Sequence, residues 1–242
     1  MILLLQTGSA PPTSEHDYAQ LFGQALGLEP VLADARLGEF PEGDWDGVVI
    51  TGSAFSTYEE LDWIAGAEEY LRRLAARGVP LYGVCFGHQL LAQAFGGKVE
   101  PCPAGWELGT CQVELNELGQ KDPLFEALPS RLSVQQSHAD VVTVLPEGAE
   151  VLAGNAHWGV QAFRLGRHIW GTQFHPEFTP ATMAAAVERV VPLLGADDEY
   201  KQQLLRNIES TSSGCLANFA RHILSRSQPV SPGQSEPHSP GR

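Results

Sequence analysis

The stretch that decides the fold is Val79-Pro80-Leu81-Tyr82-Gly83-Val84-Cys85-Phe86-Gly87-His88-Gln89. Its first six residues form a short apolar run, as in a buried strand, and His88–Phe95 has the composition of a helix. Gly83 and Gly87 stand two residues before and two residues after Cys85, where strand and helix meet. A strand-to-helix turn is so tight there that the flanking positions need to lack side chains. The pattern predicts a nucleophile elbow that presents Cys85 at the carboxyl end of a strand.

Two similar units precede this one in the chain. Ile2–Leu5 is a continuous apolar run, and residues 18–26 follow it with apolar side chains at helical spacing. Val48–Ile50 is a second apolar run, and Leu61–Ala76 follows as a second helix. Strands that alternate with helices and are apolar on both faces are typical of a parallel sheet covered on two sides.

After Gly97 the pattern changes to short β-rich runs that predict antiparallel or mixed strands. These runs are Thr110–Leu115, Leu132–Gln136, Val141–Leu145, Val151–Gly154, Val160–Leu165 and His168–Phe174. Two helical stretches follow, Ala181–Leu194 and Asp198–Leu224, the second with Ser212-Ser213-Gly214 as the place where it would break. The fold class expected is α/β, with a mostly parallel central sheet, helices on both faces and additional antiparallel strands.

The end of the chain differs in composition from the rest. Residues 225–242 are rich in Ser, Pro, Gly and Gln and have almost no apolar side chains, so packing cannot repay the entropy of ordering them. We predict a disordered tail there. Residues 1–224 contain no internal repeat and no linker long enough to divide them, which favours one domain.

Composition and charge exclude several classes of protein. Of the 242 residues, 43% are hydrophobic and 18% are charged, which is an ordinary profile for a folded protein. The 15 Lys and Arg against 29 Asp and Glu give a formal charge of -14, which repels nucleic-acid phosphates and anionic lipid surfaces. No apolar run approaches the ~20 residues that a membrane helix needs. We therefore expect a cytoplasmic protein that binds neither nucleic acid nor membranes.

Cys85 has two interpretations. Most free cysteines are small buried core residues, and Cys85, Cys102, Cys111 and Cys215 show no regular metal or disulfide spacing. The flanking glycines favour the other interpretation, a nucleophile at the start of a helix whose dipole favours a thiolate. The three other cysteines are interpreted as structural.

A candidate base lies in Gln173-Phe174-His175-Pro176-Glu177. Pro176 biases His175 towards an extended conformation, in which side chains two residues apart project to the same side. Glu177 can then hydrogen-bond one imidazole nitrogen, fix the tautomer and leave the other nitrogen for Cys85. Taken alone, the segment is equally compatible with a surface turn that has no catalytic role. The combination with Cys85 favours a catalytic triad.

Four segments together resemble the class I, triad-type glutamine amidotransferases, most closely a stand-alone subgroup similar to the glutaminase domain of GMP synthase. The segments are Val79–Gly97, Gly105-Trp106-Glu107-Leu108-Gly109, Gln136-Ser137-His138-Ala139-Asp140 and Gln173–Phe178. They stand in the order expected for that family, and the resemblance covers roughly residues 48–178. It implies a flavodoxin-like α/β sandwich.

The resemblance also implies a site. It assigns Cys85, His175 and Glu177 to the triad, and the backbone of Gly52 and Phe86 to an oxyanion hole. It assigns the binding of the α-amino and α-carboxylate groups of glutamine to Gln89, Ser137, His138, Ala139 and Asp140. On the sequence alone, Asp140 is equally well a solvated acid on a loop, and the motif match decides in favour of binding an ammonium group. No role follows for Trp106 or Glu107.

The chemistry expected from these residues is acyl transfer from a γ-glutamyl amide through a thioester, with no metal and no cofactor. Three hypotheses remain. The first is a glutaminase-type amidotransferase that releases ammonia to a separate synthetase or acceptor subunit. The second is a self-contained γ-glutamyl peptidase or hydrolase. The third is a non-catalytic regulatory protein on the same scaffold, which ranks last because nucleophile, base and orienting acid are all present.

Overall fold

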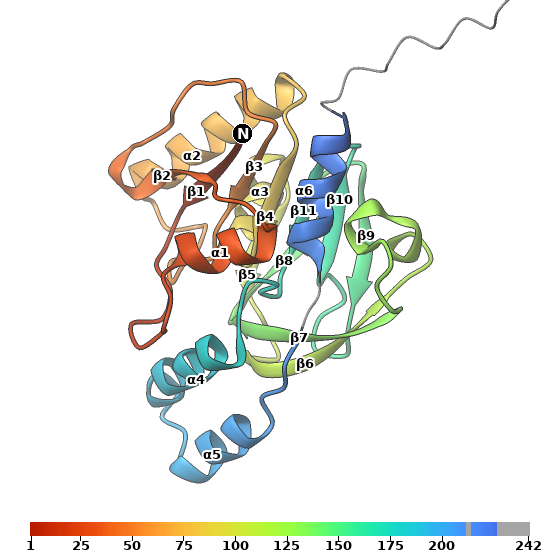
Figure 1. Cartoon of the computed structure of the whole chain (residues 1–242). Coiled ribbons are helices and arrows are strands. Elements are labelled where there is room, and N and C mark those ends of the chain that lie inside the picture. Colours follow the sequence, from red (N-terminus) through yellow and green to blue (C-terminus); the bar gives the residue numbers. More distant parts are fainter. Residues whose placement is uncertain (212–213, 227–242) are drawn as a thin grey trace, which may run out of the picture.

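A computed structural model describes residues 1–211 and 214–226 and is built around one large sheet (Figure 1). The strands of the sheet are β1 (Ile2–Gln6), β2 (Val31–Asp34), β3 (Gly47–Ile50), β4 (Leu81–Val84), β6 (Glu107–Leu115), β7 (Arg131–His138), β9 (Ala149–Gly154), β10 (Ala162–Leu165) and β11 (Ile169–Thr172). Their spatial order is β2-β1-β3-β4-β11-β10-β9-β6-β7. Neighbours from β2 to β11 are parallel, and those from β11 to β7 are antiparallel. β5 (Lys98–Pro101) and β8 (Asp140–Val144) form a separate antiparallel pair.

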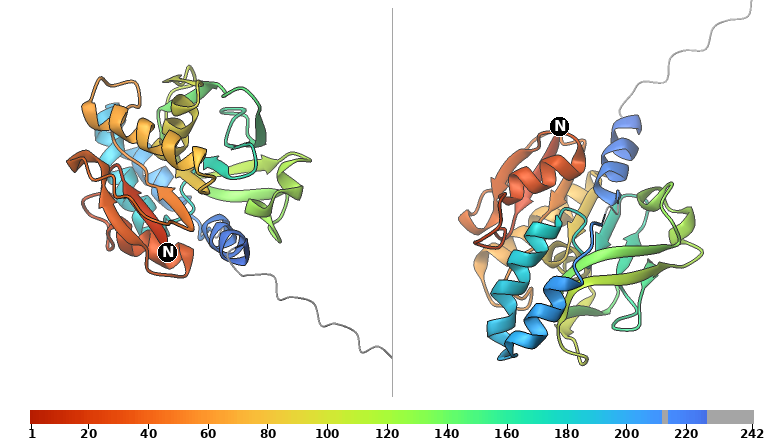
Figure 2. Two further views of the ribbon diagram at one scale, coloured as in Figure 1. Left: turned by 90° about the horizontal axis from the view of Figure 1, so that it is seen from above. Right: turned by 60° about the horizontal axis from the view of Figure 1, so that its bottom comes forward.

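Helices lie on both faces of the sheet. They are α1 (Tyr18–Leu26), α2 (Asp62–Ala76), α3 (Phe86–Ala94), α4 (Pro180–Leu194), α5 (Asp198–Arg206) and α6 (Cys215–Arg226), with short 3-10 helices at Ala35–Leu37, Gly119–Lys121 and Pro123–Phe125. Successive side chains of β1 enter different cores: Leu4 packs with α1, α4 and α6, whereas Leu3 packs with α2 and α3. Figures 1 and 2 accordingly show α2 and α6 on opposite sides of the sheet, and α4 beside α5. This alternation is why the parallel strands are apolar on both faces.

The structure confirms the α/β class and the mixed sheet, and it corrects some details of the sequence prediction. β2 and β5 were not predicted. The long helix expected at Asp198–Leu224 is two helices, α5 and α6; residues 207–211 between them are not helical, and residues 212–213 of the expected break lie outside the described residues. α6 also continues through Ser225, the first residue of the predicted tail, to Arg226. Residues 227–242, the rest of that tail, lie outside the described residues.

A search of the described residues for a helix of the length and apolar character needed to span a membrane found none.

Candidate active site

Cys85 lies at the turn between β4 and α3, at the carboxyl end of the parallel strands. Its backbone is left-handed, with φ 52° and ψ -102°, a conformation that side-chain-bearing residues rarely adopt. A Cβ on Gly83 would lie 2.2 Å from the Gly87 carbonyl oxygen, and one on Gly87 would lie 2.5 Å from that of Ile50. Both glycines are therefore required by backbone approach, as the sequence pattern predicted.

His175 and Glu177 follow β11 and form a buried pair. The His175 Nδ1 atom lies 2.7 Å from Glu177 Oε1, so the two side chains project to the same side as expected from their spacing. The backbone N–H of His175 donates to the Gln135 carbonyl at 2.9 Å, and the Phe178 ring stacks on the imidazole at 4.0 Å between centroids. The contact with Gln135 on β7 and the stacking of Phe178 fix the orientation of the His175 ring.

The His175 imidazole approaches Cys85 beside Gly52, in the loop after β3. A Cβ on Gly52 would lie 2.9 Å from His175 Cε1, 3.1 Å from the Tyr18 hydroxyl and 3.7 Å from Cys85 Cβ. Burial by itself lowers the pKa of His175. The charges of Glu177 and of the Cys85 thiolate, and hydrogen bonding to both groups, outweigh burial and raise the pKa to about 10. The site thus favours an imidazolium between a carboxylate and a sulfur.

The two predicted oxyanion-hole residues border Cys85. Phe86 is the first residue of α3, where helical N–H groups lack partners within the helix. Gly52 leaves no room for a side chain against His175. Neither amide donates to another of the described residues. Both are therefore available for an oxygen that carries negative charge.

The five residues predicted to bind substrate lie together, but most of their polar atoms bind protein. Gln89 is buried, and its amide donates to the Asp140 carbonyl at 2.8 Å and to Gln173 at 3.1 Å. The Ser137 carbonyl lies 3.9 Å from the Cys85 sulfur. The Ala139 carbonyl accepts from the backbone N–H of Cys102. These contacts hold the connection between β7 and β8 against the nucleophile.

Asp140 is the half-buried end of this group, and two hydroxyls bind it. Its carboxylate accepts hydrogen bonds from Ser56 Oγ at 2.6 Å and from the Tyr58 hydroxyl at 3.0 Å. Ser56 and Tyr58 belong to the same loop as Gly52. The loop after β3 and the β7–β8 connection are therefore joined above the site through one carboxylate.

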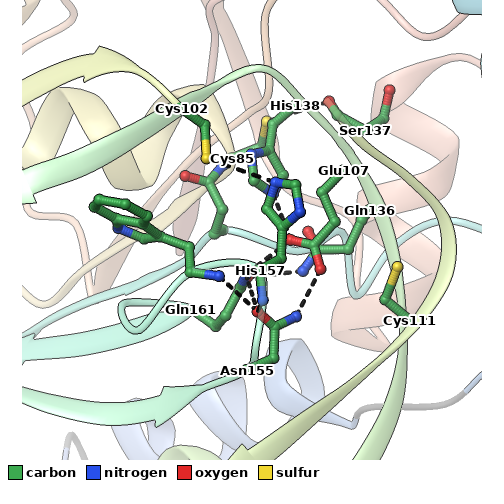
Figure 3. A network of polar contacts seen from close by, with 12 residues as sticks. Cys85, Cys102, Glu107, Cys111, Gln136, Ser137, His138, Asn155, His157 and Gln161 are labelled. Atoms are coloured by element: carbon green, nitrogen blue, oxygen red, sulfur yellow. Dashed lines mark hydrogen bonds and ion pairs between the residues drawn. The ribbon is translucent and has the colours of Figure 1, made fainter. Parts of the chain in front are cut away.

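Sequence reasoning missed the buried network beneath this connection, which Figure 3 shows around Glu107. The Glu107 carboxylate binds His138 Nε2 at 3.0 Å, Asn155 Nδ2 at 2.6 Å and Gln161 Nε2 at 2.8 Å. The other ring nitrogen, His138 Nδ1, lies 3.1 Å from the Asp140 carbonyl. We call these four residues, Glu107, His138, Asn155 and Gln161, the Glu107 network. It ties the connection between β7 and β8 to β6 and to the segments around β9 and β10.

Burial and hydrogen bonding shift the pKa of the Glu107 carboxyl in opposite directions. Burial raises the pKa of the Glu107 carboxyl, but the hydrogen bond and charge of His138, with the two amides, hold it below its usual value. Burial and the nearby Glu107 charge raise the pKa of Cys111 to about 12, so that thiol stays protonated. That Cys111 has only a structural role stays a prediction. In the part of the chain that the structure describes, no three His, Cys, Asp or Glu side chains are arranged to hold a metal ion.

Comparisons with known proteins agree with the fold. The sequence model of the family Glutamine amidotransferase class-I matches residues 27–190. γ-Glutamyl peptidase 4 of Arabidopsis thaliana is 31% identical over 203 residues, which are 80% of this chain and 79% of the peptidase. GMP synthase (glutamine-hydrolyzing) of Porphyromonas gingivalis is 39% identical over 132 residues, which are 54% of this chain but only 24% of the synthase. The chain thus matches about a quarter of that relative's length.

A solved structure gives the same result for the fold. A glutamine amidotransferase of Thermotoga maritima, 24% identical, superposes with a TM-score of 0.73 over 93% of this chain and 96% of that one. The fold is therefore a flavodoxin-like α/β sandwich, with the tight turn at Cys85 at the carboxyl edge of its parallel strands. The chain belongs to the class-I glutamine amidotransferase family.

Proposed function

We propose that this protein hydrolyses a γ-glutamyl amide, with Cys85 as nucleophile, His175 as acid and base, and Glu177 as the group that orients His175. The observation that carries the proposal is the strained turn of Cys85 together with the 2.7 Å contact between His175 and Glu177. The matches to a γ-glutamyl peptidase and to GMP synthase support a γ-glutamyl substrate.

The reaction proceeds in two acyl-transfer steps. The Cys85 thiolate attacks the γ-carbonyl carbon, and the Gly52 and Phe86 amides stabilise the tetrahedral oxyanion. The C–N bond then breaks, the nitrogen takes a proton from His175, and a thioester to Cys85 remains. Water deprotonated by His175 attacks the thioester, glutamate leaves and the thiolate returns. The Asp140 carboxylate binds the α-ammonium group of the substrate and shares its oxygens with Ser56 and Tyr58.

The leaving group distinguishes the two forms of this activity. With glutamine as donor the product is ammonia, and a separate synthetase subunit is the partner that would consume it. The GMP synthase relative supports this form. With a γ-glutamyl peptide as donor the product is an amino acid or peptide, and no partner is required. The Arabidopsis peptidase supports that form.

The test is Cys85-dependent release of glutamate from glutamine and from a panel of γ-glutamyl peptides. Cys85→Ala abolishes release if the proposal is right, whereas Cys102→Ala, a second buried cysteine, retains it. Fast turnover of a peptide with poor turnover of glutamine identifies a self-contained hydrolase. Slow turnover of every substrate, with covalent labelling of Cys85 by a glutamine-like electrophile, identifies an amidotransferase that needs its partner. Full activity of Cys85→Ala would refute the mechanism.

A further inference from the structure

A small pocket opens beside the candidate triad, on the side formed by α1 and α4. Residues that line it include Ser9, Tyr18, Ser53, Ser137, His175 and Arg189. The hydroxyl of Tyr18 is one of the groups closest to Gly52, which also borders His175 and Cys85. The Ser137 carbonyl faces the Cys85 sulfur. The pocket, which we call the Arg189 pocket, therefore borders the candidate triad through His175.

Arg189 is the cation of this pocket and has no carboxylate partner among residues 1–211 and 214–226. Its Nε atom is buried and makes no hydrogen bond. The two other half-buried arginines each bind a carboxylate: Arg36 contacts Asp34 at 2.6 Å, and Arg164 contacts Asp122 at 2.8 Å. Leaving a partly buried guanidinium unpaired costs free energy, so its position in this acidic protein calls for an anion from outside.

The neighbours of Arg189 also suit an anion. The Ser137 hydroxyl is buried in the same pocket and has no hydrogen-bond partner in the structure. Burial, together with the charges of Glu177 and Cys85, raises the pKa of Tyr18, so its hydroxyl keeps its proton. A guanidinium fork with hydroxyl donors beside it matches a carboxylate, whose two oxygens accept parallel hydrogen bonds.

We infer that the Arg189 pocket binds the carboxylate of the leaving group, so that the preferred substrates are γ-glutamyl amino acids or peptides rather than glutamine. This inference rests on the proposed function, which places the α-ammonium group of the glutamyl part at Asp140. Ammonia, the leaving group of glutamine, has nothing to bind at Arg189. The amino acid released from a γ-glutamyl peptide carries a carboxylate on the carbon next to the scissile nitrogen, which sets it close to the triad.

The test compares two substrates that differ only in that carboxylate, γ-glutamylalanine and γ-glutamylethylamide. In Arg189→Gln, kcat/KM for γ-glutamylalanine is expected to fall about 30-fold or more, while that for γ-glutamylethylamide changes less than about 3-fold. Arg189→Lys should retain part of the preference because it keeps the charge but loses the fork. Arg206→Gln, which removes an exposed arginine on α5, is the control and should change neither value.

Two results would overturn the inference: an equal loss on both substrates, which would place Arg189 at the glutamyl part or in the fold, and no loss on either. Binding to Cys85→Ala by calorimetry separates this inference from the proposed function, because it requires no turnover. If Cys85→Ala binds γ-glutamylalanine more tightly than γ-glutamylethylamide and the added Arg189→Gln removes the difference, the pocket is confirmed even for an enzyme that proves inactive. Equal affinities would refute it.

Discussion

The two sides of Cys85 are built in different ways. On one side, every side-chain polar atom of the Glu107 network has a partner within the protein, and the network holds the β7–β8 connection through the Asp140 carbonyl. On the other side, in the Arg189 pocket, the Arg189 Nε and Ser137 Oγ atoms are buried and have none. The polar atoms of the Glu107 network are hydrogen-bonded before any substrate binds, whereas two buried polar atoms of the Arg189 pocket are not.

This difference indicates how the site divides its work. A satisfied buried network is rigid, because moving any member breaks several hydrogen bonds at once. It suits the glutamyl part, which is the same in every substrate of the proposed class. Unsatisfied donors in a small pocket lower stability slightly and gain their partners from a ligand. They suit the leaving group, which varies from one substrate to another.

The largest expected effect comes from the charged contact between His175 and Glu177. Glu177→Gln replaces an acceptor by an amide that can turn its NH2 group towards Nδ1 and misorient the imidazole. We expect kcat to fall by about 1,000-fold with KM nearly unchanged. Steady-state kinetics checks this, with Glu188→Gln, an exposed acid on α4, as the control. A kcat within a few-fold of the parent enzyme would remove Glu177 from the triad.

The second effect is on stability against pH and concerns His175. Its pKa is raised from 6.5 to about 10 in the folded protein, so between these values the folded state holds a proton that the unfolded state has lost. The stabilisation is fully present below pH 6.5 and disappears as pH rises through about 10. In that window the free energy of unfolding should fall by about 1.4 kcal/mol per pH unit relative to His175→Gln. Urea denaturation at several pH values measures the slope, and parallel curves for the two proteins would contradict the prediction.

The third effect tests the comparison between the two sides directly. Glu107→Ala leaves His138, Asn155 and Gln161 buried without their shared acceptor and should lower the free energy of unfolding by about 3 kcal/mol. Arg189→Gln removes no hydrogen bond or ion pair found in the structure and should change it by less than about 0.5 kcal/mol. Urea denaturation measures both.

A surface control on the same strand makes the Glu107 result specific. Glu114→Ala, also on β6, removes only a largely exposed pair with Arg131 at 3.9 Å and should cost less than about 1 kcal/mol. If Glu107→Ala and Glu114→Ala cost the same, the Glu107 network contributes no more than a surface pair, and the contrast between the two sides fails.

The elements of the fold that a short stretch of sequence can reveal were predicted from the sequence. The elbow, α1, α2 and the strands next to them have spacing that a short window contains, and the structure confirms them. β2 was missed because it is a four-residue edge strand, in which Val31 and Leu32 are exposed, and its local sequence does not show that it pairs with β1. β5 was missed for a similar reason, since only Val99 of its four residues is buried.

In the candidate site, too, contacts between residues close in sequence were predictable, and contacts between distant residues were not. The pairing of His175 with Glu177 was predictable because two residues separate them in an extended chain. Glu107 and Gln161 lie 54 positions apart, and nothing in their local sequence marks them as partners. Arg189 lies on α4 among apolar residues and reads as the polar side of an amphipathic helix. Only the fold brings Arg189 into one pocket with Tyr18 of α1, Ser137 of β7 and His175.

The smallest expected effect concerns the hydroxyl pair above Asp140. Tyr58→Phe keeps the ring but removes the 3.0 Å hydrogen bond to one oxygen of the carboxylate, while Ser56 still binds the other at 2.6 Å. Because the Tyr58 side chain is nearly half exposed, water replaces most of what is lost. We expect KM to rise about 3-fold at unchanged kcat, less than about 1 kcal/mol, for every γ-glutamyl substrate alike. Tyr200→Phe, an exposed tyrosine on α5, is the control. A rise confined to γ-glutamylalanine would instead place Asp140 on the leaving-group side, because a contact to the glutamyl part cannot distinguish two substrates that share it.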